Sequence, residues 1–163
     1  MSLTQERVRE IFDYDPHTGS IKWRLPSSRR VHVGDEAGTV SLGYRRVNID
    51  HHFYLAHRLA WLWMTGEWPK GEIDHVNLDR ADNRWCNLRA ATRSQNLANV
   101  MALINNSCGI KGVWWHKGAG KWTSQIQVDG TAIHLGLFGT KEAAHVAYAE
   151  AAKEHFGDFA RAK

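Results

Sequence analysis

Hydrophobic and polar positions alternate along several short runs in the first third of the chain. A period of two is typical of strands that bury one face. Four runs have this pattern: Ser20–Arg24, Ala37–Leu42, Tyr44–Ile49 and His52–Leu55. The last three predict a small antiparallel sheet, and the first follows Asp15–Gly19, whose residues are typical of a turn.

Helical spacing marks two segments on either side of these strands. A Ser2-x-x-Gln5 cap, followed by apolar residues at helical spacing as far as Phe12, predicts a short first helix. The run His57–Thr65 is mainly apolar and is followed by Gly66. It therefore predicts a buried helix that ends at this glycine.

The chain then becomes polar. Between Ile73 and Asn99 it carries five Asn and three Asp. Glu72–Val76 is compatible with a strand and Asn77–Asn83 with a loop. Apolar residues at helical spacing predict a helix over Leu88–Met101, and residues 102–109 follow as a linker.

The last third has a plan of its own. Three strand-like runs are joined by the turns Gly118–Gly120 and Asp129–Gly130, and an Asp-Gly pair between alternating runs is a strong hairpin signal. The runs are Lys111–His116, Lys121–Val128 and Thr131–Phe138. Thr140 then offers an N-cap for a helix with a small-residue face. The prediction is a three-stranded sheet crossed by one helix.

At about 50 residues this region lies near the lower size limit for an independent core. Its large apolar side chains are therefore expected to be structural. They are Trp115, Trp122, Ile126, Leu135 and Phe138.

Composition limits the class of protein. The 163 residues fit one ordinary domain or two small ones, and a hydrophobic content of 43% with eight Trp argues against wholesale disorder. No apolar run has the length of a membrane span or the pattern of a signal peptide, so a cytoplasmic protein without membrane contact is expected. Cys86 and Cys108 form no CxxC pair, which fits a reducing compartment.

The distribution of charged residues along the chain indicates a polyanionic binding partner. The net charge is +4, and no Asp or Glu occurs from Asn83 to Val128. Six basic residues fall in that interval: Arg84, Arg89, Arg93, Lys111, Lys117 and Lys121. Because phosphate contacts dominate nucleic-acid affinity, this one-sign segment favours DNA binding over a chance cluster of solvated charges.

The polar segment is poorly suited to zinc or to an EF-hand. Structural zinc needs four closely paired Cys or His ligands, and an EF-hand needs alternating acids with a central Gly. A single hard cation such as Mg²⁺ fits better, because it takes a carboxylate, here Asp74, and another oxygen, here an Asn carbonyl. His75, the next residue along the strand, would then lie beside the metal as a proton acceptor for an attacking water.

Taken singly, these residues have simpler interpretations. An Asp-His pair is usually a surface or capping pair, Asn87 would be an N-cap, and Asp82–Asn83 would be a turn. His57 and Arg58 are interpreted as helix–sheet packing, with Arg58 a candidate phosphate contact. The combination is more specific, since Asn87 follows His75 by twelve residues and Asn96 follows by nine more.

Residues 11–100 resemble the HNH (His-Me finger, ββα-metal) nucleases, especially those of the phage and intron-encoded homing type. The resemblance lies in IDHVN, DNRWCNLR and RSQNLAN, with YDPHTGSIKW, GYRRV and AHRLAW before them. It implies that His75 is the general base and that Asn87 braces the loop. It also implies that Asp74 and Asn96 hold a divalent metal, with Mg²⁺ expected and Mn²⁺ as the alternative. Asn99, one helical turn on, is the rival ligand.

The tail from Gly112 to Ala160 resembles the ethylene-response-factor (Apetala-type) DNA-binding domain, which lays its sheet in the major groove. The resemblance assigns the contact positions to Lys111, Trp114, His116, Gln125, Gln127 and His134. Several positions that are usually Arg differ here, and Gln prefers adenine where Arg reads guanine. A changed sequence preference is therefore expected, with Lys111, Lys117 and Lys121 retaining affinity for DNA.

The sequence thus predicts an α+β protein, with a ββα-metal nuclease core and small N-terminal sheet in residues 1–104 and a three-stranded sheet plus helix in residues 105–163. The predicted activity is hydrolysis of phosphodiester bonds in double-stranded DNA by a homing-type HNH endonuclease, with one site per chain that nicks one strand. The protein would be a monomer or homodimer in a bacterium or phage-infected host. The alternatives are a DNA-binding regulator with a vestigial nuclease site, and an RNA-binding or structural protein.

Overall fold

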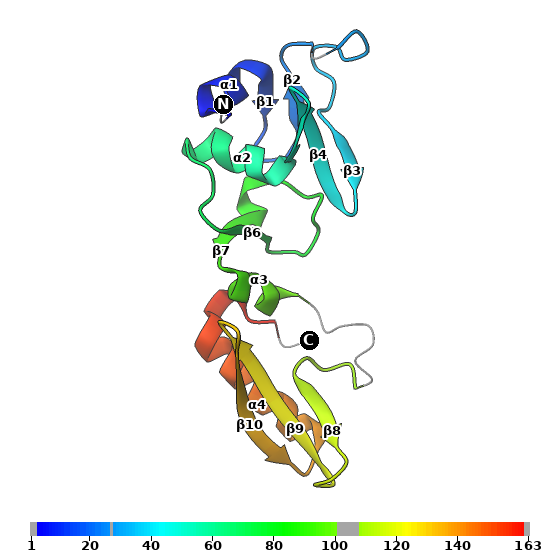
Figure 1. Cartoon of the computed structure of the whole chain (residues 1–163), viewed down its shortest axis with the longest axis vertical. Helices are drawn as coiled ribbons and strands as arrows, with labels where there is room; N and C mark the ends of the chain where they lie inside the picture. Colours follow the sequence, from blue (N-terminus) through cyan, green and yellow to red (C-terminus); the bar gives the residue numbers. More distant parts are fainter. Residues whose placement is uncertain (1–2, 27, 101–107, 162–163) are drawn as a thin grey trace. The chain divides into compact units, whose positions relative to one another are not determined.

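The protein is described by a computed structural model covering residues 3–26, 28–100 and 108–161. The chain divides into two compact units, Met1–Ala90 and Ala91–Lys163. Both mix helices with strands, so the chain is of the α+β class (Figure 1). The domain boundary predicted at 104/105 lies outside the described residues.

The first unit begins with a helix and two small antiparallel sheets. The first sheet pairs β1 with β2, and the second has the order β3-β4-β5. The bounds are α1 Gln5–Ile11, β1 Phe12–Tyr14, β2 Ile21–Trp23, β3 Thr39–Ser41, β4 Tyr44–Ile49, β5 His52–Leu55 and α2 Ala56–Thr65. Strands are therefore present within all four runs that the alternation predicted.

Local signals mark the start of α1 and the end of α2. Thr4 caps α1, its side chain accepting a hydrogen bond from the Arg7 amide; the predicted cap, Ser2, lies outside the described residues. Gly66 ends α2 in the left-handed conformation, with φ of 84°. The predicted end of the second helix is confirmed.

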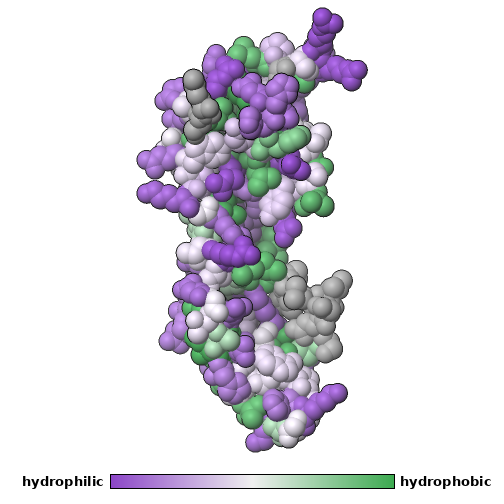
Figure 2. All heavy atoms as spheres, viewed as in Figure 1, coloured by the Kyte–Doolittle hydropathy of each residue, from purple (hydrophilic) through white to green (hydrophobic). Residues whose placement is uncertain are grey.

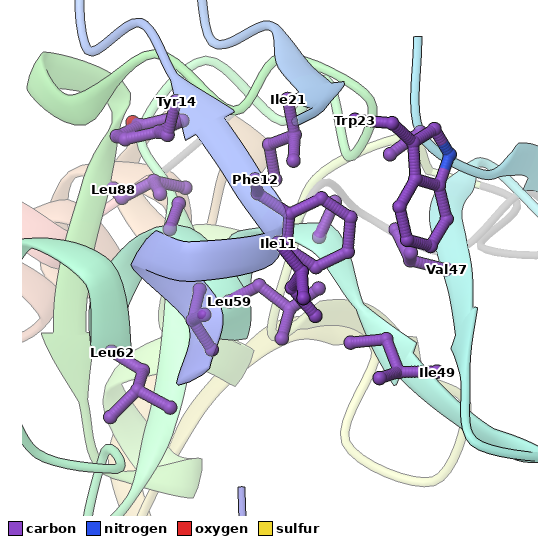
Figure 3. Close-up of a cluster of buried hydrophobic side chains, with 14 of the residues drawn as sticks. Ile11, Phe12, Tyr14, Ile21, Trp23, Val47, Ile49, Leu59, Leu62 and Leu88 are labelled. Carbon is purple, nitrogen blue, oxygen red and sulfur yellow. The ribbon is translucent and has the colours of Figure 1, made fainter. Parts of the chain in front are cut away.

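One hydrophobic core holds these elements together. Side chains from α1, β1, β2, β4 and α2 point into a common interior in Figure 3. Phe12 and Trp23 are paired across β1 and β2, and their rings lie 4.6 Å apart. Leu88 joins the same core from farther along the chain, so the polar segment is anchored to this unit.

The polar segment forms strand β6 (Glu72–His75), the short 3-10 helix η1 (Trp85–Asn87), strand β7 (Leu88–Ala91) and helix α3 (Arg93–Asn99). The prediction of a helix from Leu88 was wrong, because Leu88–Ala91 pairs with β6. A capping box explains where the helix does begin. The Thr92 side chain accepts from the Gln95 amide, and the Gln95 side chain accepts from the Thr92 amide.

The second unit contains a sheet of order β10-β9-β8 and helix α4. The bounds are β8 Val113–His116, β9 Lys121–Val128, β10 Thr131–Phe138 and α4 Lys141–Phe156. The Asp129–Gly130 turn has positive φ at both residues, as a tight hairpin turn requires. The Thr140 cap is also present, since its side chain accepts from the Ala143 amide.

The core of this unit is built from small residues of α4 that face the sheet. Ala144, Tyr148, Ala151 and Ala152 are buried with Ile126. The prediction that Trp115 is a core residue was wrong, because Trp115 is 46% exposed. It shares the α4 side of the sheet with Trp122, whose ring it meets edge to face, but it stands on the edge strand β8, whereas α4 packs mainly on β9 and β10.

On the face seen in Figure 2, hydrophobic residues occur in small groups among hydrophilic ones. Within residues 3–26, 28–100 and 108–161, no helix is both long and apolar enough to cross a membrane. Cys86 is exposed and Cys108 is half-buried, and no disulfide joins them.

Candidate active site and DNA-binding face

Strand β6 carries the candidate metal ligand, Asp74, and the candidate general base, His75. Asp74 is 3% exposed and His75 is 5% exposed. They contact different neighbours, as successive residues of a strand do. The Asp74 carboxylate lies against Arg89 of β7, whereas the His75 ring lies against His57 of α2. An acid and a base are thus adjacent in sequence but lie in separate surroundings.

His75 is surrounded by aromatic rings. The His57 ring meets it edge to face at 5.0 Å between centroids, and the Tyr44 ring lies 6.1 Å away. Burial lowers the pKa of His75, although the Asn83 side chain and the Asp74 charge act in the opposite direction. His75 is therefore neutral at neutral pH, which is the state a proton acceptor needs.

Asn87 ties together the two ends of the loop between β6 and η1. Its Oδ1 accepts a hydrogen bond from the Asn77 amide at 2.9 Å, and its Nδ2 donates to the Asp82 carbonyl at 2.8 Å. Asn87 is buried, so both contacts are shielded from water. The side chain fixes the path of the chain immediately after His75.

The same loop is supported from the N-terminal sheet. The Tyr14 hydroxyl donates to the Asn83 carbonyl at 2.8 Å, and the Trp85 amide donates to the Pro16 carbonyl at 2.9 Å. Gly19 packs so closely that a Cβ there would lie 2.5 Å from the Arg84 nitrogen. The turn at Asp15–Gly19 therefore packs against the loop that follows His75 and supports it.

Asp74 is held by a charged partner. Arg89 Nε and Nη2 each lie 2.7 Å from Asp74 Oδ2. Arg84 has a similar contact with the exposed loop, its Nη2 lying 2.6 Å from Asp82 Oδ2. Two of the six basic residues in the acid-free interval therefore have carboxylate partners from the segment just before it.

Asp74 is a buried carboxylate, the type of ligand that a hard cation prefers. Among the described residues, no group of three or more His, Cys, Asp or Glu could hold a metal, which disfavours a site made wholly of protein ligands. A cation that takes one buried carboxylate and completes its shell with amide oxygen, water and phosphate fits Asp74. Mg²⁺ and Mn²⁺ are such cations.

The two candidate second ligands lie on α3, in the second unit. Asn96 is half-buried, and Asn99 is buried. Asn99 Oδ1 accepts a hydrogen bond from Arg161 Nε at 3.3 Å. A metal would need that same oxygen, so Asn99 could act as a ligand only if this contact were given up. Since Asp74 belongs to the first unit, the pairing of Asp74 with either Asn stays a prediction.

The sheet of the second unit has one polar, exposed face. Gln125 lies opposite His134 in the register of β9 and β10, and Trp114 lies opposite Thr123 in that of β8 and β9. Trp114, His116, Gln127 and His134 are exposed, and Gln125 is half-exposed. The five side chains predicted from the strands to contact DNA are thus accessible, on the face opposite Ile126 and α4.

The predicted basic contacts differ in their surroundings. Lys117 and Lys121 are exposed near the turn between β8 and β9, and Arg93 is exposed at the start of α3. Lys111 instead donates to the carbonyl oxygens of Leu97, Ala98 and Val100 at 2.6, 2.9 and 2.9 Å. These contacts use its three N–H groups, so Lys111 caps the end of α3 in this structure.

Sequence reasoning missed the aromatic and amide neighbours of His75. His57 is packed between helix and sheet as expected, yet its partner is His75 itself. Tyr44 and Asn83 were interpreted only as strand and turn residues. Nothing in their spacing indicates the contact, because Tyr44 is brought to His75 by the packing of a separate sheet.

Comparisons with known proteins agree with this arrangement. The family model described as HNH endonuclease matches residues 54–98, which span α2, β6, β7 and most of α3. The chain is 32% identical over 82 residues to Protein 3.8 of Escherichia phage T7, and the match covers 48% of this chain and 68% of that protein. The comparison with solved structures gave no significant match. The chain belongs to the HNH endonuclease family.

Proposed function

We propose that this protein is a metal-dependent endonuclease that hydrolyses phosphodiester bonds in double-stranded DNA. One observation carries the proposal: β6 holds a buried carboxylate and a buried neutral imidazole side by side, followed by a loop that Asn87 ties at both ends. Burying a carboxylate and an imidazole is unfavourable unless they are hydrogen-bonded. A protein that only binds DNA does not need such a buried pair, whereas a nuclease does.

His75 acts as the general base. Its imidazole accepts a proton from a water molecule, and that water attacks the phosphorus atom. Packing against His57 and Tyr44 restricts rotation of the ring, so the accepting nitrogen has a fixed direction. The products are a 5′-phosphate and a 3′-hydroxyl.

Asp74 and Asn96, with Asn99 as the rival, hold the divalent metal, and Asn87 positions the loop. When bound, the metal supplies charge stabilisation for the phosphorane-like transition state and for the leaving oxygen. The order β6, β7, α3 is that of a ββα-metal motif, which supports this assignment. Mg²⁺ is the expected cation, with Mn²⁺ as the alternative.

The second unit is proposed to be the DNA reader. Its exposed sheet face offers Trp114, His116, Gln125, Gln127 and His134 to base edges, and Lys117 and Lys121 to phosphates. Arg84 and Arg93 are further phosphate contacts. The same proposal has three further parts. The second unit is ethylene-response-factor-like, the enzyme is of the homing type, and its single site per chain nicks one strand.

Incubation with supercoiled plasmid tests the activity. Open circles are expected with Mg²⁺ and none with EDTA, and linear product would mean that both strands are cut. His75→Ala should lower the rate by about 10²–10⁴-fold while DNA affinity stays the same, whereas His17→Ala, at an exposed turn, should cut normally. Duplex binding without metal-dependent cleavage would instead identify a regulator with a vestigial site.

A further inference from the structure

A guanidinium lies on the carboxylate that is proposed to bind the metal. Arg89 Nε and Nη2 both contact Asp74 Oδ2 at 2.7 Å, and the two side chains are 21% and 3% exposed. The residues stand on β6 and β7, which are paired in one sheet. The contact is therefore fixed by regular structure, unlike the pair of Arg84 with Asp82 on the loop.

This contact sets up a competition. Arginine remains charged at every physiological pH, and two donors directed to a single oxygen make a strong charge-assisted hydrogen bond. A divalent cation that approaches Asp74 meets a carboxylate whose charge is already neutralised and a guanidinium that repels it. The protein without DNA should consequently bind the cation weakly.

A phosphodiester removes the conflict. Its oxygens can accept the hydrogen bonds of Arg89 and can also complete the coordination shell of a hard cation. At 21% exposed, the Arg89 side chain is within reach of a ligand from solvent. Cation and phosphate together satisfy Asp74 and Arg89, whereas the cation alone leaves the guanidinium without its carboxylate.

We propose that Arg89 couples metal binding to DNA binding: it neutralises Asp74 in the protein without DNA, and it moves to the scissile phosphate when DNA and the divalent cation bind together. The proposal rests on the assignment of Asp74 as the metal ligand. By linkage, DNA raises the affinity for the cation and the cation raises the affinity for DNA by the same factor. This coupling through Arg89 would limit metal binding, and therefore hydrolysis, to protein that is bound to DNA.

Mn²⁺ titration followed by electron paramagnetic resonance tests the first half. Without DNA, Arg89→Gln should bind Mn²⁺ about ten-fold more tightly than the wild type, since the competitor is gone. Arg84→Gln is the matched control, because it removes a similar guanidinium–carboxylate contact away from Asp74, and its Mn²⁺ affinity should be unchanged. Asp74→Asn should lose the site.

The second half is measured with a short duplex in a His75→Ala background, so that the DNA stays intact. Duplex should tighten Mn²⁺ binding by about ten-fold or more when Arg89 is present, and by less than about three-fold in Arg89→Gln. Removing one member of a buried pair can unfold a protein, so melting curves accompany each variant. If Arg89→Gln does not fold, Arg89→Lys replaces it, and loss of the two-donor fork should reduce the gain in duplex affinity caused by Mn²⁺.

The outcomes separate the two proposals. If Arg89→Gln binds Mn²⁺ as the wild type does or more weakly while Asp74→Asn loses it, the coupling is wrong and the metal site stands. An unchanged Mn²⁺-dependent gain in Arg89→Lys also overturns the coupling. If Asp74→Asn binds Mn²⁺ like the wild type, the proposed metal site itself is wrong.

Discussion

The two units differ in the polar side chains that they bury. The first buries the ionisable residues His57, Asp74 and His75 together with Asn83 and Asn87, whereas the second buries only the neutral Asn99, Thr123 and Ser124 among its described residues, beside a core that is mainly alanine and aromatic side chains. The second unit presents its Gln, His and Lys residues on the open face of its sheet. Catalytic side chains need fixed positions in a shielded environment, whereas side chains that recognise a DNA duplex must be accessible at the surface.

This contrast has a physical consequence. Buried polar groups destabilise a fold unless each finds a partner, so the first unit depends on a network of specific hydrogen bonds around the loop after β6. The second unit depends on close packing of small residues between α4 and the sheet. Substitutions should therefore damage activity in one unit and stability or DNA affinity in the other.

After loss of His75 itself, the largest effect on cleavage is expected at Asn87. Asn87→Ala removes the contacts with the Asn77 amide and the Asp82 carbonyl and leaves both backbone groups without them. Cleavage should fall by about 10²-fold, because a small shift of His75 is enough to misalign the base. Plasmid-nicking rates and duplex affinity should be measured together.

Asn77→Ala is the comparison, since it keeps the backbone amide that Asn87 binds and removes only the hydrogen bonds of its exposed side chain with the Asp82 carboxylate and the Asp79 amide. It should lose less activity than Asn87→Ala. Wild-type cleavage in Asn87→Ala would mean that the loop holds its shape without the amide, and the division between the two units would lose its strongest support.

Two glycines of the second unit provide the next test. Gly112 and Gly109 have φ of 70° and 68°, but a Cβ at Gly112 would lie 2.3 Å from the Gln125 carbonyl oxygen, and one at Gly109 would meet nothing within 4 Å. Gly109→Ala should lower the free energy of unfolding by about 1 kcal/mol. Gly112→Ala should lower it by about 3 kcal/mol or more, because overpacking adds to the backbone strain.

Urea unfolding followed by tryptophan fluorescence measures both variants. Equal losses of stability at the two glycines would show that packing of β9 against this loop is not what holds the second unit together.

Adjacent tryptophans test which face of the sheet reads DNA. Trp114 lies on the polar face and is 43% exposed, whereas the equally exposed Trp115 contacts Trp122 on the other face. Trp114→Ala should weaken duplex binding by about 1–3 kcal/mol, the range for a contact with a base edge in the groove. Trp115→Ala should leave affinity nearly unchanged. Fluorescence anisotropy at fixed salt is the measurement, and the reverse order of effects would assign binding to the opposite face.

The smallest effect concerns the pH dependence of the first unit. Burial lowers the pKa of His57 from 6.5 to about 3. Below pH 6.5 the imidazole of His57 takes up a proton in the unfolded chain but not in the folded one. As the pH falls from 6.5 to about 3, this group therefore lowers the free energy of unfolding by about 1.4 kcal/mol per pH unit. His57→Phe should remove that part of the slope.

Urea unfolding at pH 7.5 and pH 5.5 detects the change. The stability difference between the two pH values should shrink by about 1.4 kcal/mol in His57→Phe, allowing for the half-titrated range near 6.5. His17→Ala, whose ring is exposed, should keep the wild-type difference. An unaltered difference in His57→Phe would mean that His57 is not the buried neutral group.

Much of the fold could be predicted from local sequence. The hairpins, the Gly66 stop and the Thr140 cap depend on residues within a few positions of each other, where backbone preferences are strong. The motifs that contain Asp74, His75, Asn87 and Asn96 are also local, and they carry the resemblance to the HNH family.

Local preference failed where a distant partner decided the outcome. Leu88–Ala91 has apolar residues that suit a helix, yet it became a strand because β6 was available to pair with it. Trp115 was expected in the core, and it is exposed because it stands on the edge strand β8, whereas α4 packs mainly on β9 and β10.

The sequence by itself determined most of the local elements and their order, because these follow from short-range backbone preferences, and its motifs carried the resemblance to the family. Only the tertiary structure decided which neighbours the acid, base and amide residues have. Arg89 on Asp74, His57 against His75 and Lys111 on the end of α3 all join residues that lie 11 to 18 positions apart or on separate elements. Such pairs are selected by packing, since each buried charge or ring must find its partner within the folded chain.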